Sequence, residues 1–230
     1  MSSYIYMNQK TKIMKKFIIL ALILPSLAFG QRALPSAESK WNKDLLNFRK
    51  SNNLPLERDS LLDSLAKERF FAISSFLQKK DLGYLNFFSK FLKGGHGIGE
   101  MGLQNFDSFI GSKSESLNCQ EICCFIPQYG KKSDGDMLGI INSPSNNGII
   151  NLYKNSPSHW AVVSSNIKAT EIRRKYNSRL GKWEESRSES VITNSKFGSY
   201  TGIFFYEEID PNDPNKRIQS TMVINVSIFR

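Results

Sequence analysis

An amphipathic stripe across residues 59–77 restricts the folds open to this chain more than any other feature. Asp59 is a favoured helix cap, and apolar side chains then recur at spacings of three and four residues over about five turns. The positions on this stripe are Leu62, Leu65, Ala66, Arg69, Phe70, Ile73, Phe76 and Leu77. The pattern predicts a long helix that packs one face into the core of a folded domain.

Helices are predicted before and after this stripe, and strands are predicted in the last third of the chain. Ser36 can cap a helix that places Trp41 and Leu45 on one face and ends near residues 52–53. Shorter helices are expected at residues 84–93, 103–110 and 147–155. Segments with β propensity are residues 161–163, 169–176, 183–192, 200–208 and 221–229. Helices followed by consecutive antiparallel strands predict an α+β fold with a packed sheet.

The clearest strand signal lies in residues 221–229, where side chains alternate with a period of two. Residues 127–148 are rich in Gly, Ser, Asn and Lys, lack a periodic apolar pattern, and predict a surface loop. The residues expected in the core are Trp41, Leu45, Leu65, Phe70, Ile73 and Val226.

Residues 1–30 have the composition of a secretory signal peptide. A lysine-rich segment precedes an apolar run that is short for a membrane span, and a small-x-small cleavage site ends at Gly30. We expect cleavage after Gly30, with Met14 as an alternative start of translation. Residues 31–230 are then expected to form a single exported domain, secreted or periplasmic.

The basic excess of the chain is moderate once the N-terminal segment is set aside. The net charge is +10, and removing the four lysines of residues 1–30 leaves 27 basic and 21 acidic residues, a net charge of +6. Basic clusters occur at Lys131-Lys132 and at Arg173-Arg174-Lys175, with Tyr176 beside the second. No nucleic-acid-binding motif accompanies them, so no nucleic-acid partner is expected. The excess favours solubility, or weak attraction to an anionic cell surface.

Three cysteines lie close together, at Cys119, Cys123 and Cys124. An odd number excludes a complete disulfide framework, and this spacing is not typical of a zinc site. Free cysteine packs as a small apolar residue, so we expect buried thiols. A Cys119–Cys123 or Cys119–Cys124 bridge is the alternative in an oxidising compartment.

The chain contains two histidines, so a site that uses imidazole draws on His96, His159 or both. His159 follows Asn155-Ser-Pro-Ser, which is also consistent with a helix end and turn in which the histidine has no chemical role. The scarcity of histidine and the family resemblance of both segments, described below, predict that the two histidines lie close together, and each lies in a connection that can point a side chain into a cleft.

His96 lies in a glycine-rich segment, residues 94–102, which contains the pattern G-x-G-x-x-G. A dinucleotide site would require this pattern within a βαβ unit, and no such unit is evident. The glycines are more consistent with a backbone that passes close to His96.

Two motifs resemble the CAP superfamily, which includes cysteine-rich secretory proteins, insect venom antigens and pathogenesis-related plant proteins. Residues 47–56, followed by Asp59, resemble the joined opening helices of that family. Residues 153–159 resemble the bacterial motif W-x-x-S-x-x-H, with Tyr153 in the place of the usual tryptophan. The resemblance covers residues 41–205. It implies a CAP/SCP-like α-β-α sandwich with a central antiparallel sheet, followed by a C-terminal β extension.

The resemblance also implies a surface cavity lined by histidines and acids. His96 resembles the first histidine of the family, and Glu121 resembles the glutamate of its G-E-N-(I/L) motif, although Gln120 and Ile122 depart from that motif. Glu100 is the alternative acid. The implied cavity residues are His96, Glu121, His159 and Ser156, with His96 and His159 as metal ligands.

Two imidazoles and a carboxylate are suited to a divalent metal such as Zn²⁺, because neutral imidazole is a ligand and a carboxylate fixes its tautomer. The same groups can move protons near neutral pH, but no nucleophile has an identifiable base partner. The resemblance implies an exported domain that binds a small ligand, lipid, metal ion or cell-envelope component. An envelope or extracellular hydrolase and a non-catalytic surface interaction module are the alternatives. With an ordinary imidazole pKa, zinc binding is expected to fade below about pH 6.

Overall fold

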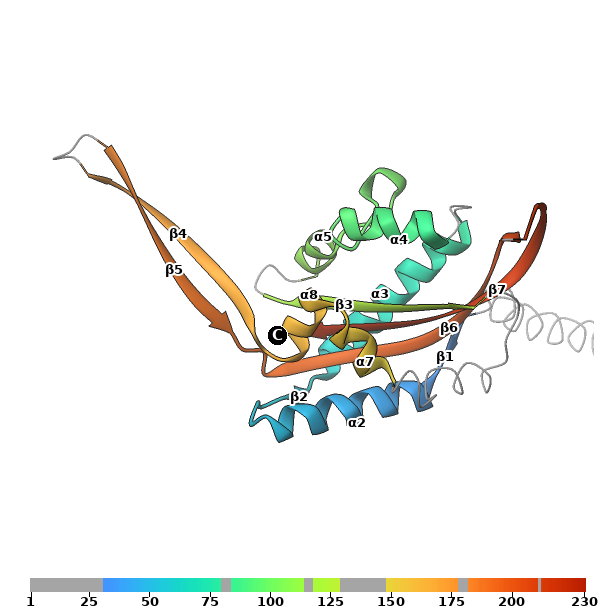
Figure 1. The fold of residues 1–230 in the computed structure, drawn as a ribbon, viewed down its shortest axis with the longest axis horizontal. Helices are drawn as coiled ribbons and strands as arrows, with labels where there is room; N and C mark the ends of the chain where they lie inside the picture. The colour runs from blue at the N-terminus through green and yellow to red at the C-terminus, as the bar shows by residue number, and fades with distance from the viewer. Residues whose placement is uncertain (1–30, 80–83, 114–117, 129–147, 178–181, 211) are drawn as a thin grey trace, which may run out of the picture.

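In the computed structural model, the protein has an α+β fold whose main sheet contains five strands (Figure 1). The structure describes residues 31–79, 84–113, 118–128, 148–177, 182–210 and 212–230. Its elements are β1 (Arg32–Ala33), α2 (Pro35–Ser51), β2 (Glu57–Arg58), α3 (Ser60–Lys79), α4 (Tyr84–Lys93), the 3₁₀ turn η1 (Gly99–Met101), α5 (Phe106–Gly111), β3 (Gln120–Gln128), α7 (Ile149–Lys154), α8 (Pro157–Val163), β4 (Ile167–Asn177), β5 (Lys182–Ile192), β6 (Lys196–Asp210) and β7 (Asp213–Phe229). The expected signal peptide and most of the expected 127–148 loop lie outside the described residues.

The last strand of the chain lies inside the main sheet. The strand order is β1-β6-β7-β3, with β7 antiparallel to both neighbours, and β2 adds a short parallel pairing to β6. Phe229 of β7 lies opposite both Phe197 of β6 and Gln120 of β3. The pairing continues along β7 to Asp210 of β6 and to Gln128 of β3. β7, the last strand of the chain, thus lies in the interior of the sheet, and β3 forms one edge.

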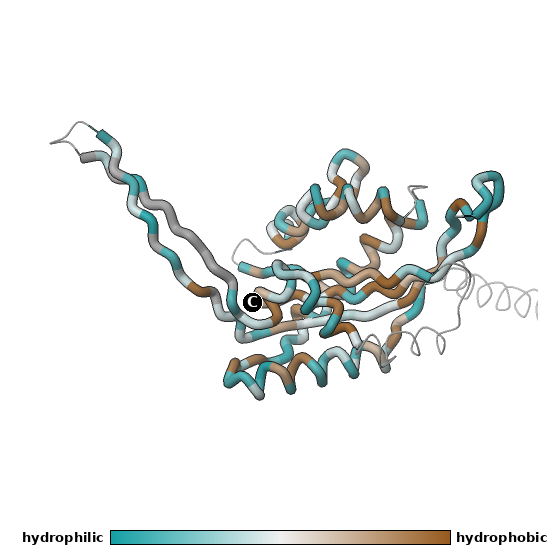
Figure 2. The backbone as a smooth tube through the Cα atoms, in the orientation of Figure 1, coloured by the Kyte–Doolittle hydropathy of each residue, from teal (hydrophilic) through white to brown (hydrophobic). Residues whose placement is uncertain are grey.

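Helices cover both faces of this sheet, and β7 supplies side chains to both layers (Figure 1). Met222, Ile224, Val226 and Ile228 pack on the side of α3, α4 and α5. Val223 and Phe229 point to the other side, where α2, α7 and α8 pack. Alternate side chains of β7 therefore belong to two different cores, because successive side chains of a strand point to opposite faces. This is the period of two that the sequence predicts. Hydrophobic segments gather where these layers meet (Figure 2).

The two predicted N-terminal helices form as expected, apart from one cap. Asp59 caps α3, because its Oδ1 accepts the backbone N–H of Leu61 at 2.9 Å. The first helix begins at Pro35 with Leu34 as its cap, not Ser36. Leu34 donates its N–H to the carbonyl of Thr201 at the end of the β1 pairing, and the helix therefore begins two residues earlier than expected. All six residues predicted in the core are buried.

Two strand predictions require correction. Residues 161–163 end helix α8 instead of forming a strand. Pro157 occupies the first turn, where proline favours a helix, and Val163 is fully buried, so packing overrides β propensity. The predicted strands at 169–176 and 183–192 do form, as β4 and β5, but they make a separate two-stranded sheet that projects from the body (Figure 1).

The cysteines are free thiols, with Cys123 and Cys124 buried and Cys119 half-buried. The preferred expectation of buried thiols is thus confirmed for two of them, and neither alternative bridge is formed. Within the described ranges, no helix combines the length and apolar character that crossing a membrane requires.

Leu65 provides a direct test of the core assignment, since only 5% of it is exposed within α3. Leu65→Ala is expected to lower the free energy of unfolding by about 2–5 kcal/mol, because it leaves a cavity in packed surroundings. Leu61→Ala on the same helix is the matched control, because Leu61 is 51% exposed and such surface changes stay within about 0.5 kcal/mol. Urea unfolding of both variants makes the comparison, and equal losses would contradict the assignment.

Candidate ligand and metal site

A tight glycine-rich turn after α4 positions His96. A Cβ at Gly97 would lie 2.4 Å from Asn105 Cα, so only glycine allows this close approach. His96 itself adopts a left-handed φ of 61°, a conformation that non-glycine residues rarely adopt. The expected role of the glycines next to His96 is confirmed. The segment continues into the η1 turn, not into a strand–loop–helix unit that would bind a dinucleotide.

A buried arginine on α3 holds this turn against β3. Arg69 Nε donates to Glu121 Oε1 at 2.9 Å, and Nη1 donates to the carbonyl of Gln104 at 2.9 Å. Nη2 donates to the carbonyl of His96, and the guanidinium lies over the ring of Phe109. Arg69 therefore joins a helix, an edge strand and the glycine-rich turn at one point.

Glu121 bridges Arg69 and the first histidine. Its second carboxylate oxygen lies 3.0 Å from His96 Nδ1, and the side chains of Arg69 and Glu121 are each 1% exposed. The His96 ring also stacks on Phe91, with centroids 5.2 Å apart and planes 9° apart. Because an ionised carboxylate only accepts hydrogen bonds, the network assigns the proton to His96 Nδ1 and leaves Nε2 with a free lone pair.

The second histidine approaches from the other face of the sheet, on α8. The His159 ring centroid lies 5.8 Å from that of His96 and 5.6 Å from that of Tyr153. Tyr153 is fully buried, and its hydroxyl donates to Asn225 Oδ1 of β7 at 2.8 Å. The expected proximity of His96 and His159 is thus present in the fold, and Tyr153 supports the second ring.

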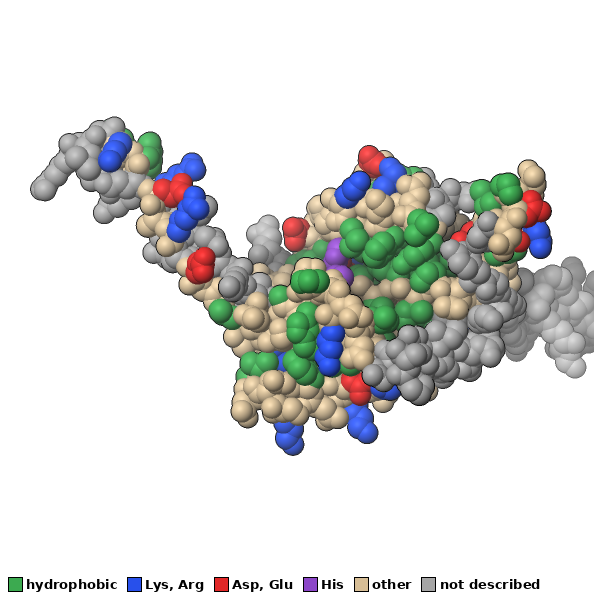
Figure 3. All heavy atoms as spheres, viewed as in Figure 1, with side chains coloured by type: hydrophobic (Ala, Val, Ile, Leu, Met, Phe, Trp, Pro, Cys, Tyr) green, Lys and Arg blue, Asp and Glu red, His purple; other side chains and the backbone are tan. Residues whose placement is uncertain are grey.

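Both imidazoles line a cavity of about 430 Å³ at the β3 edge. Its wall residues come from α4, β3, α7 and α8, and Figure 3 shows the histidines set among hydrophobic side chains. The lining residues are Phe88, Leu92, His96, Cys123, Cys124, Phe125, Leu152, Tyr153, Ser156, Ser158 and His159. Ser156 is therefore in the cavity, as the resemblance implies. Glu121 lies buried behind His96, whereas Glu100 pairs with Lys90 at the surface, 2.9 Å away.

Burial controls the protonation of the second histidine. Desolvation, with a smaller contribution from the neighbouring His96, lowers the pKa of His159 to about 4, and the negative charge of Glu121 opposes this shift. The imidazole of His159 is therefore neutral well below pH 6. The expectation that this ligand protonates near pH 6 used an ordinary pKa and does not hold for His159.

Two overlapping donor sets exist in the cavity. His96, Glu121 and Cys123 each place one potential ligand atom within 4.8 Å of the others. Burial and the charge of Glu121 raise the pKa of Cys123, which keeps the thiol protonated, and Glu121 is already engaged by Arg69. The pair of His96 Nε2 and His159 is the better metal-binding set, because both imidazoles line the cavity.

The spacing of the two rings fits a shared ion. Two imidazoles on one tetrahedral Zn²⁺ have centroids roughly 5 Å apart, because each Zn–N bond is about 2.0–2.1 Å long. The observed 5.8 Å is within a small side-chain adjustment of that arrangement. Glu121 behind His96 then matches the carboxylate–histidine–metal geometry common at such sites.

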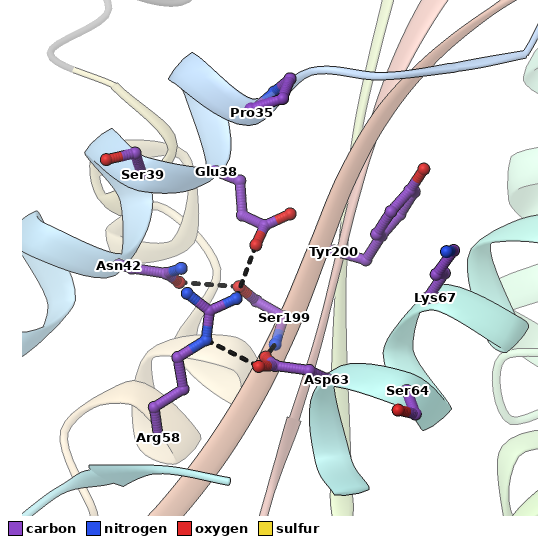
Figure 4. A pocket seen from close by; sticks show the side chains of 10 residues that line it. All are labelled: Pro35, Glu38, Ser39, Asn42, Arg58, Asp63, Ser64, Lys67, Ser199 and Tyr200. Carbon is purple, nitrogen blue, oxygen red and sulfur yellow. Dashed lines mark hydrogen bonds and ion pairs between the residues drawn. The ribbon is translucent and has the colours of Figure 1, made fainter. Parts of the chain in front are cut away.

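A second cavity, of about 490 Å³, lies between α2 and α3 over β6 (Figure 4). Arg58 bridges Glu38 and Asp63 across it, at 2.7 Å to each carboxylate. The remaining carboxylate oxygens accept the backbone N–H groups of Ser199 and Thr201. These charged groups satisfy one another and fasten both helices to the sheet, so this cavity is a weaker candidate for chemistry.

Arg69 is the site residue whose role the sequence did not reveal. Its spacing places it on the apolar stripe of α3, which predicts a core position, and Arg69 is fully buried. The sequence does contain a signal for this role: Arg69 is a cation within an apolar helix stripe, and Glu121 is an acid within an apolar run. Buried charges of this kind require a partner, so each predicts the other.

No protein-family model and no curated protein matches the chain. Among solved structures, an outer surface protein from Borrelia burgdorferi is similar, with a TM-score of 0.40 and 14% sequence identity. The match covers 87% of this chain and 96% of that chain. A likeness this distant carries no inference about function, so the site is interpreted from its own geometry.

The lowered pKa of His159 predicts a specific acid sensitivity of the metal-free protein. In the unfolded chain the imidazole titrates near its ordinary value of 6.5, whereas in the folded protein it titrates at about 4. Between those values the unfolded state binds more protons, so the free energy of unfolding falls as the pH falls. We expect this part of the decline to disappear in His159→Gln, as measured by urea unfolding at several pH values. An unchanged pH profile in the variant would contradict the assignment.

Proposed function

We propose that the protein is an exported, CAP-like binding domain whose histidine cavity takes a divalent cation of the Zn²⁺ class. The resemblance of residues 47–56 and 153–159 to CAP motifs supports the CAP-like α-β-α sandwich, and the composition of residues 1–30 supports export. The α+β architecture with helices on both faces is compatible with that class.

The observation that carries the metal proposal is the hydrogen bond between His96 Nδ1 and Glu121. It orients the ring, fixes the tautomer and raises the basicity of Nε2, which are the contributions that a carboxylate makes behind a metal-binding histidine. His159 provides a second neutral nitrogen across the cavity. Two protein ligands leave coordination positions for water or for a ligand group, as at an open site.

A covalent hydrolase receives less support from the same geometry. Ser156 lines the cavity. Among the described residues, its hydroxyl makes no hydrogen bond to the imidazole of His96 or of His159. Burial raises the pKa of the Cys123 and Cys124 thiols, which makes them poor nucleophiles. No activated nucleophile therefore faces the cavity from these positions.

A small amphipathic ligand is the second candidate, favoured by the composition of the cavity walls. Leu92 and Leu152 are 43% and 37% exposed beside the paired imidazoles. Apolar walls with a few convergent polar groups are typical of small-molecule sites. Such a ligand would place its polar group at the histidines and its apolar part along these leucines.

Calorimetric titration with Zn²⁺ at about pH 7.5 tests the metal proposal, because neutral imidazole is the ligand form. The wild-type chain is expected to bind one ion, and the His96→Ala/His159→Ala variant to bind none at that site. Glu121→Gln is expected to weaken binding about 10–100-fold, the usual effect of losing a supporting carboxylate. Glu100→Gln is the matched control and should bind as the wild type does, because Glu100 pairs with Lys90 at the surface.

Circular dichroism of each variant separates loss of the ligand from loss of the fold. Zinc binding that survives in the folded double-histidine variant would contradict the metal proposal. Co²⁺ absorption provides an independent readout of nitrogen coordination. An absent spectrum together with saturable binding of an amphipathic probe would favour the second candidate.

A further inference from the structure

Among the described residues, none of those in the arm formed by β4 and β5 lines the histidine cavity. Its strands pair antiparallel from Ile167 opposite Ile192 to Asn177 opposite Lys182, and the arm projects away from the body (Figure 1). Eleven residues per strand correspond to a length of about 36 Å. A two-stranded hairpin is marginally stable by itself in water, so its exposed end is a place to look for a contact.

An aromatic pair occupies the far end of the arm. Tyr176 and Trp183 face each other across the strands, with ring centroids 5.3 Å apart. Tyr176 is 50% exposed and Trp183 is 67% exposed, whereas Trp41 in the body is 1% exposed. Cross-strand contact explains why the rings meet, because such pairs stabilise hairpins. It does not explain why two large rings remain open to solvent at the point farthest from the core.

Cations border this pair on the same face. The pleat places Arg174 and Glu185 beside Tyr176 and Trp183, because residues two apart share a face. Glu185 contacts Arg174 at 3.4 Å and Arg187 at 3.0 Å, and both arginine side chains are 71% exposed. Glu189 lies two residues beyond Arg187 on this face, so the positive charge comes from the sequence around the aromatic pair: residues 173–187 hold six basic and two acidic residues, a net charge of +4.

The exposed area favours an interfacial contact over a protein partner. A whole tyrosine or tryptophan side chain buries about 150–250 Å², so the exposed parts of two rings supply roughly 300 Å². A stable protein interface needs about 800 Å² from each partner. Tyrosine and tryptophan instead concentrate at the boundary of a bilayer, where their rings bury an apolar body and keep a polar group in water.

We propose that the far end of the β4–β5 arm binds the anionic surface of a lipid bilayer. Tyr176 and Trp183 lie at the headgroup level, and Arg174, which shares their face and is 71% exposed, contacts the lipid phosphates. Figure 3 shows hydrophobic, basic and acidic side chains side by side on this part of the arm. Such binding is independent of the histidine cavity, which lies on the body of the protein.

Co-sedimentation of the full chain with vesicles tests the proposal. We expect binding to phosphatidylcholine vesicles that contain about 30% phosphatidylglycerol, and weaker binding in about 0.5 M NaCl, because salt screens the attraction. The Tyr176→Ala/Trp183→Ala variant is expected to lose roughly tenfold or more in partitioning. Arg174→Gln, which keeps the aromatic pair, is expected to lose about fivefold. Val191→Ser is the matched control, because Val191 is 58% exposed at the base of the same arm.

All variants keep residues 1–30, so any contribution of that apolar segment is common to every comparison. A shift of tryptophan emission to shorter wavelength on vesicle addition, absent in Trp183→Phe, places the ring at the bilayer. Equal vesicle binding by the wild type and both arm variants would overturn the proposal, as would no binding at all. Light scattering that shows the aromatic pair controlling self-association, with vesicle binding unchanged, would also overturn it.

Discussion

The candidate site depends on the buried ion pair between Arg69 and Glu121. Taking two charges out of water is costly, and such a pair is tolerated only when its remaining hydrogen-bonding groups are also satisfied. Here the other Arg69 nitrogens bind the carbonyls of His96 and Gln104, while the second Glu121 oxygen binds His96 Nδ1. Loss of either partner would leave an uncompensated buried charge, which typically costs about 3–5 kcal/mol.

A second buried network positions the other histidine from the opposite face of the sheet. Trp41 Nε1 donates to Ser227 Oγ at 2.9 Å, and the Tyr153 hydroxyl donates to Asn225 Oδ1 at 2.8 Å. These contacts fix α2 and α7 on β7, and α7 leads directly into the helix that carries His159. The cavity at the edge strand β3 therefore receives one imidazole from each layer of the fold. Its chemistry requires both layers to be packed correctly.

Periodicity predicted the parts of the fold that local burial determines. The α3 stripe, the Trp41 face and the alternation around Val226 all lead to buried positions. Residues 161–163 were predicted as a strand, because β propensity does not show that packing holds their β-branched side chains in helix α8. The strands β4 and β5 were predicted, but their separation from the main sheet was not. The two histidines were predicted as site residues because the chain has no others and because their segments resemble family motifs. The Arg69–Glu121 pair was not predicted, because 52 residues separate its members and only the fold brings them together. The lowered pKa of His159 likewise follows from burial, which a residue type does not reveal.

The tautomer of His96 tests the central claim most directly, because the Arg69–Glu121 pair is proposed to prepare that ring for a ligand. Nitrogen-15 NMR at about pH 7.5 distinguishes which ring nitrogen carries the proton. The chain has two histidines, so the His159→Gln variant assigns the signals. The account predicts a proton on His96 Nδ1, facing Glu121, and an unprotonated Nε2. A proton on Nε2 with Nδ1 bare would contradict it, because Glu121 would then have no proton to accept and the cavity no free imidazole nitrogen at His96.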